Sequence, residues 1–176
     1  LNTDTTFRYA NKNVVAQWKH VFNNKLYMTL TTGIDSYDYS VKGDNGTIKA
    51  YTLSFGIMQK HFRTEFNYSP NNTHLLNFGV TGIHYSIQPG EILPSGNGSL
   101  VVPDKIADEQ GREMAAYLGD RINLTDRLSV NAGIRYSLYQ FLGPNRVYGY
   151  VEGLPRDQST VTDSTYYAKG KAIQTY

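Results

Sequence analysis

The sequence predicts an all-β fold: an antiparallel up-and-down meander of about six strands that forms part of a transmembrane β-barrel. Two features of the chain indicate this class. Apolar and polar residues alternate with a period of two through most of residues 13–140, and short turns alternate with long connections between the alternating segments. A helical membrane protein is excluded, because no stretch approaches the ~18 consecutive apolar residues that a transmembrane helix needs.

The composition agrees with an ordered β-protein. The 176 residues are 40% hydrophobic and 18% charged, which is typical of a folded domain. Tyrosine occurs 15 times, against 7 phenylalanines and 1 tryptophan, and suits strands and the interfacial girdles of membrane barrels. The net charge of +2 is spread along the chain, so we expect no nucleic-acid partner. The absence of cysteine excludes disulfide bonds and thiolate zinc sites.

The clearest predicted strand covers residues 127–139. One of its faces is apolar and the other is polar, a separation that a strand produces and a helix would not. The apolar set is Leu128, Val130, Ala132, Ile134, Tyr136 and Leu138. The polar set is Ser129, Asn131, Gly133, Arg135 and Ser137.

The same alternation predicts five further strands, each near the ~9–11 residues that cross a bilayer at a tilt. They cover residues 13–22, 25–35, 61–68, 73–85 and 112–123. His20 and Asp120 are exceptions, because each is a polar residue on an otherwise apolar face.

A seventh alternating stretch precedes residues 61–68. Its members Tyr51, Leu53, Phe55 and Ile57 have the opposite parity to Phe62. We therefore expect an outward extension of the third strand with a β-bulge between the two parts, or else a separate short strand.

The connections between the strands carry the membrane prediction. Asn23-Asn24, residues 69–72 and Thr125-Asp126 are compact, turn-forming links. Residues 42–48, 88–111 and 141–176 are long links, and the last of them never settles into a period. Outer-membrane barrels have short periplasmic turns and long extracellular loops in this alternation, whereas soluble meanders have no reason to.

The alternation also assigns side chains to the two surfaces of the barrel wall. The residues predicted to face lipid are Trp18, Leu30, Phe62, Phe66, Phe78, Val80, Leu128, Val130, Ile134 and Leu138. The residues predicted to face the lumen are Gln17, Lys19, Arg63, Glu65, Asn77, Asn131 and Arg135, with Arg121 beside them. Such a polar wall would contact a plug or line a passage, or it would only solvate the interior.

Several segments resemble the barrel of TonB-dependent receptors, particularly those of Bacteroidetes. Residues 114–120 (MAAYLGD) and 124–136 (LTDRLSVNAGIRY) are similar to the "AxYxxD" strand and the "LTDxLxxNxGxRY" hairpin of that family. Residues 16–26 and 69–80, with Pro89-Gly90 at the outer end of the latter, resemble two further hairpins. The order and spacing of these motifs, over most of residues 13–140, make the resemblance fairly specific.

The resemblance implies a barrel of about 22 strands in the bacterial outer membrane, filled by a plug domain and energised through an N-terminal TonB box. Neither plug nor box is recognisable in residues 1–176. About six strands cannot close, since the smallest barrels have about eight, so we expect an internal fragment of one barrel domain that ends in an extracellular loop. The implied partners are outer-membrane lipid, the rest of the barrel and its plug, TonB through the missing N-terminal part, and an unknown nutrient ligand.

The sequence offers no catalytic or cofactor motif. GxSxG, HExxH and P-loop patterns are absent, so we expect no enzyme and no cofactor. We expect no metal site either: His74 and His84 lie about 33 Å apart along one strand, and His61 and Glu65 do not converge there. A ligand contact is expected in the last long loop, at Arg146, Tyr148 and Tyr150.

Two functions other than that of a receptor remain possible from the sequence: a soluble binding module and a small complete barrel. The resemblance implies uptake of a large scarce nutrient such as a siderophore, cobalamin, a glycan or a peptide. A soluble β-rich carbohydrate-binding or adhesin module would instead pack its apolar faces together and use tyrosines as sugar platforms. A small complete barrel would need about two more strands from residues 141–176, where no alternation is visible.

Overall fold

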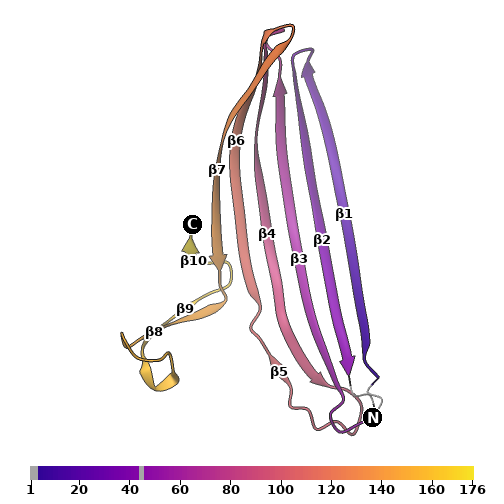
Figure 1. Cartoon of the computed structure of the whole chain (residues 1–176), viewed down its shortest axis with the longest axis vertical. Coiled ribbons are helices and arrows are strands. Elements are labelled where there is room, and N and C mark those ends of the chain that lie inside the picture. Colours follow the sequence, from indigo (N-terminus) through magenta and orange to yellow (C-terminus); the bar gives the residue numbers. More distant parts are fainter. Residues whose placement is uncertain (1–3, 44–45) are drawn as a thin grey trace.

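The computed structural model describes residues 4–43 and 46–176, so part of the expected loop at residues 42–48 lies outside the described residues. A single long, curved sheet dominates the molecule (Figure 1). Its long strands are β1 (Thr6–Asn23), β2 (Leu26–Gly43), β3 (Tyr51–Tyr68), β4 (His74–Pro94), β6 (Glu109–Thr125) and β7 (Leu128–Leu142). The short elements are β5 (Asp104–Lys105), β8 (Asn145–Tyr150), the 3₁₀ turn η1 (Gln158–Thr160), β9 (Val161–Tyr167) and β10 (Ala172–Thr175).

The predicted meander is confirmed. The strand order in the sheet is β1-β2-β3-β4-β6-β7-β10, with β5 added to the end of β4, and every pairing is antiparallel. The compact turns lie at one end of the sheet and the long connections at the other (Figure 1). Neighbours in sequence are therefore neighbours in space, as in an up-and-down barrel wall.

The strands are longer than expected. Each of the six covers 15 to 21 residues, whereas ~9–11 residues suffice to cross a bilayer. The additional residues lie at the end with the long connections, where residues 6–12 of β1 pair with residues 36–42 of β2. The sequence prediction missed them because the apolar alternation that marks a membrane crossing does not extend that far.

The expected bulge within β3 is wrong. The pairing of β3 with β2 runs without a break from Leu26↔Tyr68 to Gly43↔Tyr51. The irregularity lies instead in β4, because Gln88 pairs with Gly56 and Glu91 pairs with Ser54. Proline cannot donate to the ladder and is tolerated at bulges, so the bulge forms around Pro89. Because β3 itself contains no bulge, Phe55 and Ile57 lie on the same face as Arg63 and Glu65.

The last connection was also predicted incompletely. Strands β8 and β9 form a separate two-stranded hairpin within residues 141–176. Strand β10 then returns to the sheet antiparallel to β7, and Tyr139 and Tyr176 exchange backbone hydrogen bonds of 3.1 and 2.9 Å. The expectation that this segment is loop to its end is therefore wrong, because β10 runs beside the outer end of β7.

The sheet has no second layer among the described residues. Only Val41, Ala50, Ala115 and Leu142 are buried hydrophobic residues there, and no large side chain is fully buried. Large apolar side chains instead lie open on the sheet, including Trp18 at 56% and Ile134 at 73% exposure. The expectation for a soluble module, apolar faces packed on each other, is therefore wrong. No helix in the described part of the chain is long and apolar enough to cross a membrane.

The two faces differ in exposure because the sheet is curved. Along β6, Arg112, Met114, Ala116 and Leu118 are exposed, while the residues between them are buried or half-buried. Residues on the concave side of a curved sheet crowd one another, so the second set marks that side. Close packing also requires glycine at some positions. A Cβ at Gly33 would lie 2.7 Å from the ring of His61, which covers that glycine from β3.

Candidate functional site

The register separates the two predicted sets of residues. All residues predicted to face lipid have even numbers and lie on one face of the sheet, which we name the apolar face. All residues predicted to face the lumen lie on the other, the polar face. Trp18, for example, pairs with Leu30, and Lys19 pairs with Thr29, which pairs with Glu65. The grouping follows from the register, while the medium in contact with each face remains a prediction.

The polar face carries a connected hydrogen-bond network near the short turns. Arg63 forms an ion pair with Glu65, and its guanidinium lies 5.9 Å from the centre of the Tyr117 ring. Glu65 also accepts hydrogen bonds from Asn67 at 3.3 Å and from the Tyr117 hydroxyl at 3.3 Å. Asn77 donates to Asn67 at 3.1 Å and connects β4 to this network. The predicted lumen-facing set contains three of these five residues, Arg63, Glu65 and Asn77, and lacks Asn67 and Tyr117.

A second polar cluster lies further outward on the same face. The carboxylate of Asp35 accepts hydrogen bonds from Asn13 and, at 3.1 Å, from Gln59. Its Oδ2 also lies 3.0 Å from Nδ1 of His61. His61 therefore contacts a carboxylate on β2 and not Glu65 of its own strand. Together the two clusters give a mixed-charge wall that extends across five strands, β1 to β4 and β6.

Two other predicted residues of this wall lie on β7 and two on β1. Arg135 lies 3.8 Å from Glu113 and donates to Ser137 at 3.1 Å. Asn131 pairs with Arg121 in the register. On β1, Lys19 lies 4.2 Å from the centre of the Tyr27 ring, and Gln17 donates to Thr31 at 3.3 Å. The polar wall thus extends from β1 to β7.

Asp120, the exception in the predicted pattern, lies on the apolar face. Its Oδ2 is 2.6 Å from Nδ1 of His74, so a histidine on the neighbouring strand β4 is its hydrogen-bond partner. The pair lies close to the turn that joins β3 to β4, which the orientation predicted from the sequence puts at the periplasmic boundary of the membrane. An ionisable pair is tolerated better at that level than in the middle of a hydrocarbon layer.

The outer half of the polar face is aromatic, which the sequence prediction missed. Phe7, Tyr39 and Phe55 lie on β1, β2 and β3, and we name these three residues the aromatic ladder. The Phe7 and Tyr39 rings are stacked with centroids 6.5 Å apart, and Tyr39 and Phe55 are stacked at 6.0 Å. Phe7 is 61% exposed. The ladder escaped detection because a bulge in β3 was expected, which would have turned Phe55 to the opposite face.

The predicted ligand residues of the last connection lie in the β8–β9 hairpin. Arg146 donates to Ser164 of β9 at 3.3 Å, and the rings of Tyr148 and Tyr150 are 6.5 Å apart. Arg156 lies 6.0 Å from the Tyr150 ring. The link between the strands is ordered by Asp157, whose carboxylate caps η1. The backbone N–H of Ser159 donates to it at 2.8 Å and holds the pKa of Asp157 below its usual range, with the Ser159 hydroxyl adding to the effect.

Comparison with known proteins gives one match. A family model described as "TonB dependent receptor-like, beta-barrel" matches residues 1–169. No curated protein and no solved structure matches the chain. The family match covers nearly the whole chain and includes both the polar wall and the aromatic ladder.

Proposed function

Since this chain belongs to the TonB-dependent receptor-like β-barrel family of the outer membrane, we propose that it forms a sector of the wall of a receptor that imports a large, scarce nutrient. Membership in a family of transport receptors supports no enzymatic role. The sheet supports the sector assignment, because β1 has no strand partner on its outer side in the described residues. An open edge in lipid leaves backbone groups unsatisfied, so further strands are expected to close the barrel.

In the proposed orientation the apolar face contacts lipid and the polar face lines the lumen. The curvature supports this assignment, since the polar face lies on the concave side along β6. The wall of Arg63, Glu65 and Asn77 then faces the plug domain and water. The family further implies that TonB acts on the plug through an N-terminal segment, so residues 4–176 would supply wall and loops and not the contact with TonB.

The aromatic ladder is the observation that carries the ligand proposal. It lies on the lumen side, in the half of the sheet nearest the long loops, where a nutrient enters from outside. Stacked rings bind flat, apolar ring faces well, so the ladder favours a ligand with rings over a linear peptide. A glycan, an aromatic siderophore or cobalamin fits this chemistry. Arg146, Tyr148 and Tyr150 of the β8–β9 hairpin would add a second contact from the outer loop.

The Bacteroidetes subgroup is also part of this proposal. It is supported by the hairpin at residues 114–136, whose short turn the structure places between β6 and β7. The gene neighbourhood of the intact receptor provides the test. A surface lipoprotein gene beside it would support the subgroup, and its absence in related genomes would count against it.

The function is tested by growth. A strain that lacks the intact receptor should fail on one nutrient from a panel of ferric siderophores, cobalamin, glycans and peptides, and the receptor gene should restore growth. The substitution Tyr39→Ala removes the middle ring of the ladder and should weaken binding of that nutrient about tenfold, because stacking and burial of one ring contribute on the order of 1–2 kcal/mol.

The matched control is Tyr136→Ala, which removes the same side chain from the apolar face of β7. It should leave the dissociation constant of the nutrient unchanged. Equal binding by the parent and the Tyr39→Ala receptor would contradict a role of the ladder in ligand contact, while growth of the receptor-deficient strain on every nutrient would contradict the transport role itself.

A further inference from the structure

Towards the long connections, the apolar face ends in a row of basic residues. Lys60 of β3 pairs with His84 of β4, and His84 pairs with Arg112 of β6, so the three side chains lie next to one another on the same face. Lys60 and Arg112 flank His84, so two fixed positive charges lie two strand spacings, about 10 Å, apart on this face with an imidazole between them. Two cations on an otherwise apolar face favour a compensating group of negative charge.

The protein itself supplies little compensation. In residues 4–43 and 46–176, neither Lys60 nor Arg112 forms an ion pair with a carboxylate. Arg112 instead donates from Nε and Nη2 to the amide oxygen of Gln140, at 3.1 and 2.5 Å, which fixes its guanidinium beside β7. The nearest carboxylate along β2 on this face is Asp38, four residues outward from Ile34, and it accepts a hydrogen bond from Ser36 at 3.2 Å.

A groove of about 540 Å³ lies against this row. The groove is lined by two neighbouring rows of apolar-face residues on four strands. These residues include Ile34, Phe62, Met114 and the three basic residues. The row between them contributes Gly33, His61, Ile83 and Glu113, which pair with one another across the four strands. The groove is therefore open on the apolar face, with an apolar part towards the short turns and a basic edge towards the long loops.

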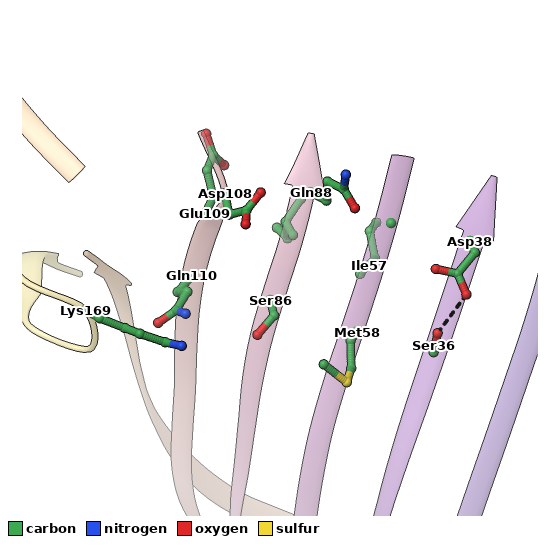
Figure 2. Close-up of a pocket in the computed structure, with 12 residues that line it drawn as sticks. Ser36, Asp38, Ile57, Met58, Ser86, Gln88, Asp108, Glu109, Gln110 and Lys169 are labelled. Atoms are coloured by element: carbon green, nitrogen blue, oxygen red, sulfur yellow. Dashed lines mark hydrogen bonds between the residues drawn. The ribbon is translucent and has the colours of Figure 1, made fainter. Parts of the chain in front are cut away.

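A second, polar groove of about 360 Å³ continues outward from the basic row on the same face. Figure 2 shows its hydroxyl, amide and carboxylate groups on β2, β4 and β6, with the side chain of Lys169 extending towards Gln110. Asp38 and Asp108 at its edges provide acceptors for hydroxyl groups. Along the face, apolar, basic and polar surfaces thus follow one another in that order.

The level of the basic row fits the outer boundary of the membrane. From His74, at the start of β4, to His84 the strand advances about 33 Å. At a tilt of about 40° this corresponds to roughly 25 Å along the membrane normal, the height of the apolar band of such barrels. The long loops lie outside the cell, so the row lies at the headgroups of the outer leaflet.

We propose that this surface binds a phosphate-bearing glycolipid of the outer leaflet. Its acyl chains occupy the apolar groove, its phosphate lies on Lys60, His84 and Arg112, and its sugar hydroxyls reach the polar groove. Charged hydrogen bonds from lysine and arginine are the usual means of holding a phosphate. This inference depends on the proposed orientation of the two faces, but not on the nutrient that the receptor imports.

The test uses the intact receptor in detergent and measures its thermal unfolding midpoint as lipid is added. Bisphosphorylated lipid A should raise the midpoint, while the same lipid A without its phosphates, or inorganic phosphate alone, should not. The double substitution Lys60→Gln with Arg112→Gln should weaken the response to lipid A by about tenfold or more, because both charged donors are lost.

Arg121→Gln is the matched control, because it removes a charge from the polar face of the same strand β6; its response to lipid A should equal that of the parent. Equal responses to lipid A with and without phosphates would overturn the proposal in favour of general lipid contact. An equal response to inorganic phosphate, or no effect of the double substitution, would overturn it as well. The Tyr39→Ala receptor should still respond to lipid A, so a failed nutrient proposal is distinguishable from a failed lipid site.

Discussion

Replacing Gly79 with alanine is expected to destabilise the barrel by about 3 kcal/mol or more, the upper range for overpacking a sheet whose backbone has to move. A Cβ at this position would overlap the carbonyl oxygen of Thr64 on β3 and lie 2.9 Å from the hydroxyl of Tyr117 on β6. The first of these atoms belongs to the backbone and cannot rotate away. Displacing it would break ladder hydrogen bonds between β3 and β4, which lipid cannot replace.

The measurement is the urea concentration at which half of the intact receptor is unfolded. Folded and unfolded barrels are distinguished by their mobility on a gel. Gly119→Ala provides the control, since it adds the same methyl group to the same face. Its Cβ would find ordinary contacts, the nearest being the Ala132 carbonyl oxygen at 3.6 Å. If both variants unfold at the same urea concentration as the parent, the tight contact between β3 and β4 is not present in the folded receptor.

Leu30→Lys should cost about 2–4 kcal/mol of unfolding free energy, the range for a lysine on the lipid side of a barrel near the bilayer midplane. Leu30 lies in the middle of the apolar face, paired with Trp18 and Thr64. A lysine there would carry its charge into hydrocarbon, far from either headgroup layer.

The adjacent substitution Thr29→Lys should cost less than about 1 kcal/mol, as expected for a charge in contact with water. Thr29 lies on the polar face between Lys19 of β1 and Glu65 of β3, so the new ammonium group meets one like charge and one carboxylate, whose effects are opposed and small at a hydrated surface. The comparison is made by urea unfolding in lipid vesicles. Equal costs for the two neighbours, or a larger cost for Thr29→Lys, would show that the faces have been assigned to the wrong media.

The part of the fold that could be predicted from the sequence is the part where apolar and polar residues alternate without interruption. Residues 128–138 have one apolar and one polar set, so their two faces could be assigned without knowing the partner strands. The compact turn at Thr125-Asp126 and the long link at residues 88–111 then gave the order of the meander. Local chemistry sufficed, because turn residues and alternation are both local properties.

The missed features depend on contacts between strands. Alternation shows that Phe55 and Phe62 differ in parity, but it does not say whether a bulge corrects the difference, and the bulge formed at Pro89 in the neighbouring strand. The alignment of Lys60, His84 and Arg112 likewise requires the register of three strands, which the turns fix and the sequence of any one strand does not. The β8–β9 hairpin was missed because its strands are short and their alternation is broken by Thr162.

The orientation of the two faces is the central claim, and a cysteine scan along β7 tests it most directly. Residues 1–176 contain no cysteine, so a spin label can be placed at each position from 128 to 138 of the intact receptor in lipid vesicles once any cysteine outside these residues is replaced. We predict that labels at even positions, such as Ile134, collide with oxygen dissolved in the lipid, and that labels at odd positions, such as Arg135, collide with a water-soluble nickel complex. Accessibility without a period of two, or with the two sets exchanged, would contradict the account.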